Sequence, residues 1–218
     1  LLGNLQLNTS PGQEYNYQNV AFSLIGDVLE VATGKKYEDL LQDKLFTPLG
    51  MNGAGSGYNH LTNLENKAYP HYFQFGKYKN RNIESKYFDV GPAAGVNASI
   101  EDMIKYARLM TGYYPDILGE ESVEQLFFPQ VEVSKKESSV IGWQPIEKAW
   151  YGLGWRGVQK NQRKIIFHGG FVNGYRSEIA LIPEEKLALV VLTNAPNPII
   201  SEIGSNFIDF WDAQLVKQ

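Results

Sequence analysis

Tyr17 and Asn19 are the first candidates for chemistry, because they flank Gln18 at the start of a predicted helix over residues 18–33. A helix N-terminus offers free N–H groups, and nearby positive charge favours the ionised tyrosine that can act as a general base. The simpler alternative is that Asn16 or Asn19 caps the helix while Tyr17 packs. Taken alone, the segment favours this alternative.

His168, Gly169 and Gly170 form the second candidate, at the end of a predicted strand over residues 163–170. Two successive glycines at a strand end indicate a close approach to the backbone. The N–H of Phe171 could then serve an oxyanion hole, and His168 could donate a hydrogen bond or carry charge near neutral pH. A hairpin corner that a histidine happens to cap is the alternative, and alone this stretch favours it.

The first half of the chain is predicted to be helical and rich in loops. Ser99, with Asp102 three residues later, caps a helix whose inner face is formed by Ile100, Met103, Ile104 and Ala107. The segment 50–98 has no sustained period, and such long stretches usually carry function or cover a site. Further helices are predicted over 18–33, which should be largely buried, over 37–46, which should end before Pro48, and over 120–128.

After about residue 150 the apolar period changes to two, which indicates a sheet. Strands are predicted over 151–158, 163–170, 174–182 and 187–194, with the turn at Pro183. Residues 187–192 are apolar on both faces, so we expect a central strand covered on both sides. Asn197 and Pro198 should open a last helix that packs across the sheet through Ile200, Ile203, Phe207, Phe210 and Trp211.

The predicted class is α+β, as one domain with two parts. Residues 1–148 should form a helical, loop-rich lobe, and residues 149–218 an antiparallel sheet backed by the C-terminal helix.

Composition excludes several classes of function. The formal net charge is -4 and no basic stripe is present, which argues against nucleic acid as the main partner. The longest apolar runs are too short for a transmembrane segment. The chain has no cysteine, so disulfides, cysteine-ligated metals and a cysteine nucleophile are excluded. We expect no metal and no cofactor, because His60 and His71 lack a carboxylate at ligand spacing.

The two candidate segments together resemble a known family. "YNYQNVAFSLIGDVLEVATGKKYEDLLQDKLFTPLGM", "YGLGWRG" and "HGGFVNGYRSEIALIPEEKLALVVLTN" are similar in order and spacing to the serine β-lactamase-like superfamily. Its nearest branch holds class C β-lactamases, D-alanyl-D-alanine carboxypeptidases, D-aminopeptidases and related esterases. The resemblance implies a β-lactamase/transpeptidase-like fold and a serine hydrolase. Such an enzyme acts through an acyl-enzyme on an ester, a D-amino-acid peptide or a β-lactam, in the periplasm or at the cell surface.

The family's second and third motifs match residues of this chain. By resemblance, Tyr17 would be the general base or proton shuttle, and Asn19 would hold a substrate carbonyl or the lysine of the first motif. His168 would orient Tyr17 or meet a substrate carboxylate, and Gly169 and Gly170 complete the third motif. Phe171 would give a backbone N–H to the oxyanion hole.

The family's first motif, Ser-x-x-Lys, is absent, since no serine is followed by lysine three residues later. We expect the nucleophile upstream, in an N-terminal part of the fold that this C-terminal portion lacks and needs as a partner. The sheet should then have an open edge and an uncovered face, with poor stability alone. The alternative is a relative that lost its nucleophile and binds peptides or cell wall.

Two further features bear on the substrate. His-Gly in place of Lys-Thr in the third motif favours an esterase or D-amino-acid peptidase over an efficient β-lactamase, because histidine is only partly charged near pH 7. The aromatic cluster between Tyr69 and Tyr78 could line the substrate cleft or simply pack the loop, and these alternatives stay open.

Overall fold

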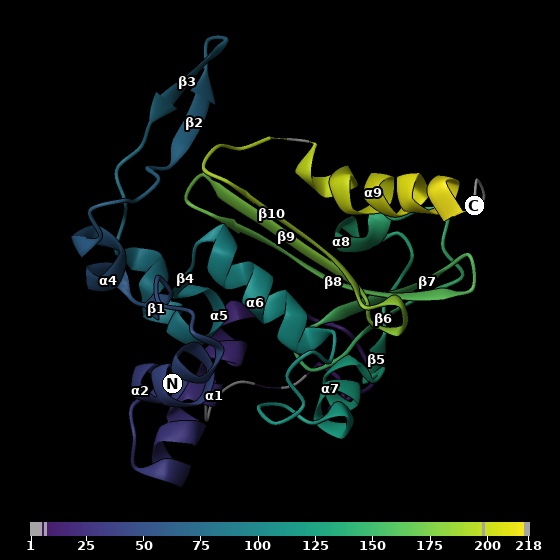
Figure 1. Cartoon of the computed structure of the whole chain (residues 1–218), viewed down its shortest axis with the longest axis horizontal. Coiled ribbons are helices and arrows are strands. Elements are labelled where there is room, and N and C mark those ends of the chain that lie inside the picture. Colours follow the sequence, from purple (N-terminus) through teal and green to yellow (C-terminus); the bar gives the residue numbers. More distant parts are fainter. Residues whose placement is uncertain (1–5, 7, 198, 216–218) are drawn as a thin grey trace.

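The computed structural model describes residues 6, 8–197 and 199–215. Its centre is an antiparallel sheet with strand order β10-β9-β8-β7-β6-β5 (Figure 1). The strands are β5 (Val131–Glu132), β6 (Lys148–Tyr151), β7 (Arg156–Lys160), β8 (Arg163–Val172), β9 (Tyr175–Ile182) and β10 (Leu187–Thr193).

Helices lie on both faces of this sheet. In Figure 1, α9 (Ile200–Leu215) and α8 (Ser138–Ile141) lie on one face, and α6 (Ile100–Met110) runs along β9 and β10 on the other. Each face has its own apolar core. The α6 core is built around Leu109, Ile166 and Leu181, and the α9 core around Val158, Ile165 and Ile182. The predicted α+β class is confirmed.

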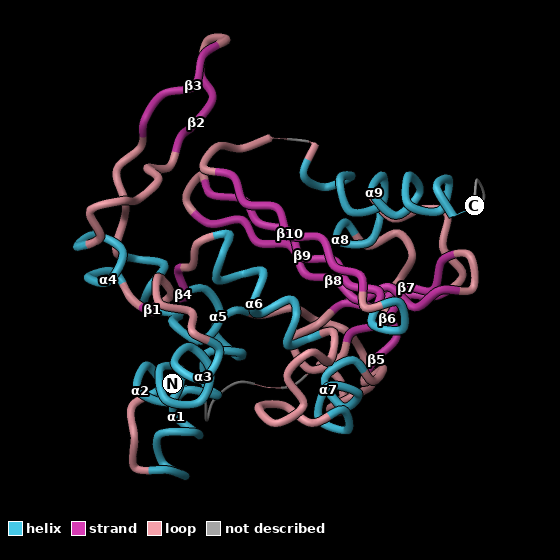
Figure 2. Tube along the Cα trace, in the orientation of Figure 1, coloured by secondary structure: helices cyan, strands magenta, loops and turns pink. Residues whose placement is uncertain are grey.

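The remaining elements form the helical lobe and a separate hairpin, which Figure 2 distinguishes by colour. No helix in the described part of the chain is both long and apolar enough to cross a membrane. The separate hairpin consists of β2 (His71–Gln74) and β3 (Lys77–Asn80). The other remaining elements are α1 (Asn19–Thr33), α2 (Tyr37–Leu41), a π-helical turn (Gln42–Phe46), α3 (Thr47–Leu49), β1 (Gly55–Ser56), α4 (Tyr58–Asn63), a 3₁₀ turn (Lys86–Val90), α5 (Gly91–Ala94), β4 (Val96–Asn97) and α7 (Glu120–Phe127).

Helix α6 begins as its sequence predicts. The Ser99 hydroxyl accepts a hydrogen bond from the Asp102 N–H at 3.2 Å, and the Asp102 carboxylate accepts one from the Ser99 N–H at 3.2 Å. This reciprocal pair satisfies two N–H groups at the helix start, and it is a full capping box.

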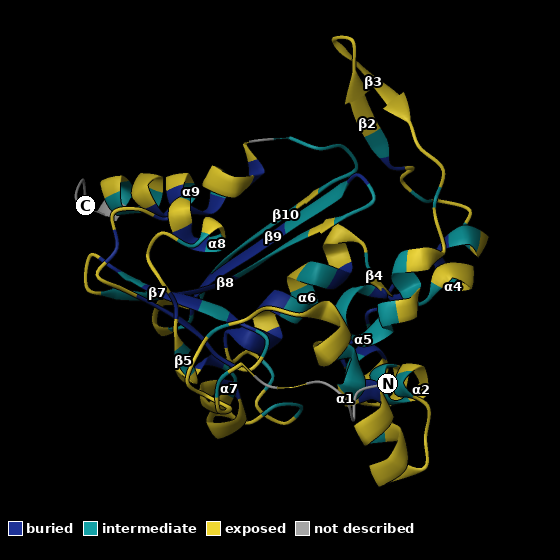
Figure 3. Cartoon of the chain, turned by 180° about the vertical axis from the view of Figure 1, so that it is seen from behind, coloured by how far each residue is buried: buried dark blue, intermediate teal, exposed yellow. Residues whose placement is uncertain are grey.

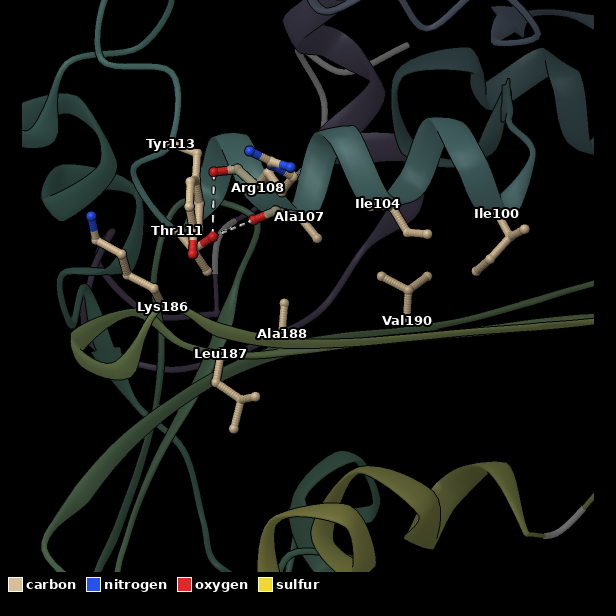
Figure 4. Close-up of a pocket in the computed structure, with 10 residues that line it drawn as sticks. All are labelled: Ile100, Ile104, Ala107, Arg108, Thr111, Tyr113, Lys186, Leu187, Ala188 and Val190. Atoms are coloured by element: carbon tan, nitrogen blue, oxygen red, sulfur yellow. Dashed lines mark hydrogen bonds between the residues drawn. The ribbon is translucent and has the colours of Figure 1, made fainter. Parts of the chain in front are cut away.

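The face of α6 predicted to be internal is only partly covered. Ile104 is 51% exposed, and with Ile100 it lines a groove of about 440 Å³ between α6 and β10. Figure 4 shows both isoleucines pointing towards Val190, while Leu187 points away from the groove. The apolar pattern is correct, but no described element fills the groove.

Strand β10 is an edge strand, so the prediction of a central strand is wrong. It pairs only with β9 among the described residues, although helices lie on both of its faces. A strand without a neighbour on one side leaves a row of unpaired N–H and C=O groups along that side. This is the open sheet edge that the sequence predicts.

The prediction that α1 is largely buried is also wrong. Gly26 is its only residue described as buried, and Val31 is 88% exposed. Figure 3 shows most of α1 as exposed. The helix contacts α5 along one side, and no described element covers the other side. Its apolar residues therefore form an uncovered face.

Two predicted boundaries move. The strand predicted over 151–158 is interrupted: residues 152–155 form the turn between β6 and β7, because Gly154 adopts a φ of 80° and the Gly152 N–H donates to the Trp155 carbonyl at 2.7 Å. The second helix does not stop before Pro48. It continues through the π-helical turn and α3 to Gly50, because proline is tolerated in the first turn of a helix.

The C-terminal helix packs on the sheet with most of the predicted face, including Ile200 and Phe207, but not with Phe210. Phe210 is 60% exposed, whereas Ile200 and Ile208 are buried against the sheet. The Asn197 side chain accepts a hydrogen bond from the Ile199 N–H at 3.0 Å just before the helix. Pro198, the predicted first helical residue, lies outside the described residues.

A buried lysine fixes α9 to the sheet. Lys160, at the end of β7, is 3% exposed. Its ammonium group donates to the Ser205 hydroxyl at 2.7 Å and lies 2.9 Å from the Asp209 carboxylate. A buried ammonium is tolerated only with such partners, so the group fixes the position of α9.

We expect Asp209→Ala to lower the free energy of unfolding by about 2 kcal/mol, because the Lys160 ammonium loses its one charged partner among the described residues. The loss is moderate because the Asp209 carboxylate is half-exposed. Lys160→Met keeps the apolar stem, removes the charge and should cost less than about 1 kcal/mol. Urea denaturation of both variants checks this. Equal losses in the two variants would contradict the assigned role of the ion pair.

Candidate active site

Tyr17 and His168 lie side by side. Their ring centroids are 6.3 Å apart, although the residues come from opposite ends of the sequence. Tyr17 lies two residues before α1, whose N-cap Gln18 makes no side-chain capping bond. Capping by Asn16 or Asn19 is therefore wrong. Asn19 is the first residue of α1 and is exposed, and among the described residues its side chain makes no hydrogen bond to Tyr17 or His168.

Strand β8 continues past the end of β7, which leaves one of its edges open beside Tyr17. Pairing with β7 stops at Phe167, whereas pairing with β9 continues to the Val172–Tyr175 pair. The two-residue turn Asn173-Gly174, with positive φ at both positions, makes that last pair a hydrogen-bonded one.

Antiparallel pairs alternate between hydrogen-bonded and non-hydrogen-bonded. Gly169 and Phe171 therefore turn their backbone N–H and C=O groups away from β9, towards the open edge. The prediction for the Phe171 N–H requires an amide that does not pair with β9, and Tyr17 lies against His168, a residue of the same strand as Phe171.

The two glycines make room for side chains of β9. A Cβ at Gly169 would lie 2.6 Å from a carboxylate oxygen of Glu178, and a Cβ at Gly170 would lie 2.5 Å from the Ser177 hydroxyl. Both distances are far below van der Waals contact. The neighbouring strand is thus a sufficient reason for glycine here, in addition to any approach by a substrate.

Arg156 is a site residue that sequence reasoning missed. Its guanidinium carbon lies 5.1 Å from the centroid of the Tyr17 ring and 5.9 Å from that of Tyr151. Its Nε is buried without a hydrogen-bond partner among the described residues. Nothing in the local pattern of "YGLGWRG" points to Tyr17. Only the register, which pairs Arg156 with Phe167 beside His168, brings it there.

Glu178 is a second missed residue, and an acidic residue inside the apolar strand "SEIALI" could have drawn notice. Its side chain is buried. Burial raises the pKa of this carboxyl to about 7, against the opposing charges of Arg156 and Arg176. Glu178 therefore titrates near neutral pH.

The pKa of His168 shifts in the opposite direction. Burial, followed by the positive charge of Arg156, lowers the pKa of its imidazole to about 4. His168 is therefore neutral at pH 7, with one ring nitrogen as donor and the other as acceptor.

The Phe171 side chain is 59% exposed, and the Arg176 guanidinium lies 4.5 Å from its ring centroid. By strand alternation it faces the side of the sheet opposite His168. Within the described residues, no three acidic or histidine side chains are grouped to hold a metal ion.

Comparison with known proteins places this geometry in a family. The beta-lactamase family model matches residues 1–204. A D-aminopeptidase of Gluconobacter oxydans (strain 621H) is 30% identical over 88% of this chain and 34% of its own length. The D-alanyl-D-alanine-carboxypeptidase/endopeptidase AmpH of Escherichia coli (strain K12) is 26% identical over 94% of this chain and 54% of its own length.

Among solved structures, the octameric penicillin-binding protein homologue from Pyrococcus abyssi has a TM-score of 0.75 at 23% identity. The match covers 92% of this chain and 44% of that one, and it supports the fold. The chain thus spans between a third and just over half of the length of these relatives. Because the family model covers nearly the whole chain and the fold agrees, the chain belongs to the β-lactamase family.

Proposed function

We propose that this chain carries part of the active site of a serine hydrolase that works through an acyl-enzyme. The observation that carries the proposal is the placement of Tyr17 beside His168, next to the open edge of β8. In this proposal Tyr17 is the proton acceptor, His168 is its neutral partner, and the Phe171 N–H is a backbone donor at the open edge of β8. These are parts that acyl transfer requires.

Each group has a role in this proposal. Tyr17 takes the proton from a serine hydroxyl as that oxygen attacks the substrate carbonyl, and passes it to the leaving amine or alcohol. The Phe171 N–H stabilises the negative oxygen of the tetrahedral intermediate. Neutral His168 orients Tyr17, and the nearby Arg156 guanidinium is complementary to a phenolate. Water then hydrolyses the acyl-enzyme, and Asn19 contacts the substrate carbonyl or the lysine of the first motif.

We further propose that the nucleophile belongs to a segment outside this sequence. No Ser-x-x-Lys occurs in the chain, and the matched relatives are longer. The uncovered side of α1 and the groove between α6 and β10 are apolar surfaces that such a segment would bury. Exposed apolar surface of this kind is typical of a missing partner.

An ester or D-amino-acid amide is the favoured substrate class. A neutral His168 lacks the fixed charge that a lysine in the third motif brings to a β-lactam carboxylate. The names of two relatives, a D-aminopeptidase and a D-alanyl-D-alanine-carboxypeptidase/endopeptidase, point the same way. A periplasmic or cell-surface location is part of the same proposal.

A covalent label tests the nucleophile. We expect the full-length protein, incubated with a fluorophosphonate or a penicillin, to gain the mass of one adduct on a serine upstream of this chain. Intact mass spectrometry followed by peptide mapping locates it. A folded full-length sample that gains no adduct with either reagent would favour the alternative, a peptide- or cell-wall-binding relative without a nucleophile.

The role of Tyr17 is tested by Tyr17→Phe. Removal of the hydroxyl should lower kcat at least about a hundredfold, because proton transfer loses its acceptor. The ring contacts with Phe22 and Arg156 are kept, so the melting temperature should hold. Tyr15→Phe is the matched control, since Tyr15 packs on Tyr151 at 5.2 Å and should keep full activity. Unchanged turnover in Tyr17→Phe would remove Tyr17 from the mechanism.

The protonation states give a pH test. Glu178 has a folded pKa of about 7 against an ordinary pKa of 4.5, so the folded state holds more protons between these values. Its contribution to stability is thus lost as pH rises through this window. His168 has a folded pKa of about 4 against an ordinary pKa of 6.5, so stability is lost as pH falls from 6.5 towards 4.

As pH rises from 4 to 8, the free energy of unfolding of Glu178→Gln should increase relative to that of the wild type by up to about 3 kcal/mol. The reason is that a glutamine cannot ionise in the buried site. Urea denaturation at a series of pH values measures the difference. His168→Asn should remove the decrease in the free energy of unfolding that the wild type shows as pH falls from 6.5 to 4. A pH-independent difference between Glu178→Gln and the wild type would show that Glu178 does not titrate as assigned.

A further inference from the structure

The hairpin formed by β2 and β3 stands away from the rest of the molecule (Figure 1). Two hydrogen bonds attach it to the segment after β10: at its base the His71 N–H donates to the Asn194 carbonyl at 2.8 Å, and nearer its tip the Tyr78 hydroxyl donates to the Pro196 carbonyl at 3.2 Å. Beyond His71, every residue of both strands is exposed, as Figure 3 shows. A two-stranded hairpin without a packed face is marginal in water.

The tip of this hairpin carries an aromatic residue in an unfavourable position. Phe75 and Gly76 form the two-residue turn with φ of 50° and 74°. Such turns favour Asn-Gly, and a bulky residue at positive φ is uncommon and strained. Phe75 is also 90% exposed, so burial of its ring contributes almost nothing to the fold, although the Lys79 ammonium lies 5.8 Å from the ring centroid. Strain that the structure does not use points to a role outside it.

Positive charge surrounds the tip, although the whole chain carries a net charge of -4. Residues 66–83 contain Lys67, Lys77, Lys79 and Arg81 but neither Asp nor Glu. Arg81 pairs with Glu84 at 3.0 Å, while Lys77 and Lys79 have no ion pair among the described residues. Two cations without an acidic partner therefore flank Phe75, and the Lys79 ammonium donates to the Gln74 side chain at 3.2 Å.

The ribbon also has two distinct faces. Phe73 and Tyr78 pair on one face with ring centroids 5.1 Å apart, and Tyr72, Lys77 and Lys79 lie on the other. The Phe73 and Tyr78 rings meet edge to face at 60°, so they form no flat platform for stacking a sugar. A second copy of the same hairpin would bring like charges together, which is unfavourable.

We propose that this hairpin binds the surface of an anionic lipid bilayer. Phe75 enters the boundary between headgroups and acyl chains, where aromatic rings are enriched. Lys77 and Lys79 meet the phosphate groups, each of which adds attraction to an anionic surface. The proposal concerns a different part of the molecule from the acyl-transfer site and stands without it.

The hairpin is connected to the strand that bears the candidate site. The Asn173 side chain donates to the Asn82 carbonyl at 3.1 Å, and Asn173 lies in the turn that follows β8. Binding through Phe75 would therefore hold the β8–β9 turn at the side of the molecule that faces the bilayer.

Vesicle co-sedimentation of the full-length protein tests the proposal. The vesicles are phosphatidylglycerol and phosphatidylcholine in equal amounts, or phosphatidylcholine alone, each at low and high NaCl. We expect binding to the anionic vesicles, weakened by salt. Phe75→Asn creates the favoured Asn-Gly turn, so the hairpin should stay folded while binding falls about tenfold. The double variant Lys77→Gln/Lys79→Gln should lose most of the salt-sensitive binding, about thirtyfold.

Phe210→Gln is the matched control, because Phe210 is an exposed aromatic residue on α9 and its loss should leave binding unchanged. Equal binding by Phe75→Asn and the wild type, or no binding to either vesicle, would overturn the proposal. So would equal binding to lipid-free polyglutamate. Light scattering that finds an assembly which Phe75→Asn dissociates would assign the hairpin to contacts between copies instead.

Discussion

The arrangement of the candidate site depends on one constraint, the register of β8 between its two neighbours. Two-residue turns fix it on both sides, at Asn161-Gln162 towards β7 and at Asn173-Gly174 towards β9. With this register the backbone groups of Gly169 and Phe171 that do not pair with β9 face the edge that β7 leaves open. A slip of one residue would turn them towards β9 and move His168 to the other face. The backbone donor and the imidazole are thus set by the same pairing.

Arg156 links the electrostatics of the site. Burial is the larger effect, and it lowers the pKa of His168 and raises that of Glu178. The charge of Arg156 acts on both groups in the direction of a lower pKa. The result is a neutral imidazole and a carboxyl that titrates near neutral pH, on opposite faces of the sheet. His168 carries no charge at pH 7. The positive charge beside Tyr17 is therefore that of Arg156, whose guanidinium carbon lies 5.1 Å from the centroid of the Tyr17 ring. A third motif without lysine can therefore still be accompanied by a fixed cation.

Sequence patterns predicted those features that local chemistry determines. The strand period and the Ser99 cap need only neighbours in sequence, and both are confirmed. The pairing of Tyr17 with His168 was predicted through a family resemblance, since no local pattern connects residues so far apart. Arg156 and Glu178 were missed because their roles arise from register across strands. The turn after Tyr151 was read as strand because its alternating apolar residues imitate the period of two.

The errors about burial share one physical cause. The outer side of α1, the face of α6 with Ile104, and β10 were all predicted to be covered because their sequences are apolar. The outer side of α1 and the groove face of α6 lack a covering element among the described residues, and β10, with helices on both faces, lacks a neighbouring strand at one edge. The opposite face of the sheet is closed by α9, which Lys160 anchors from within the core. One face is thus finished and the other is not, and α1, which follows Tyr17 directly, belongs to the unfinished side. The segment that we propose to carry the nucleophile to Tyr17 would therefore also cover this side of the core.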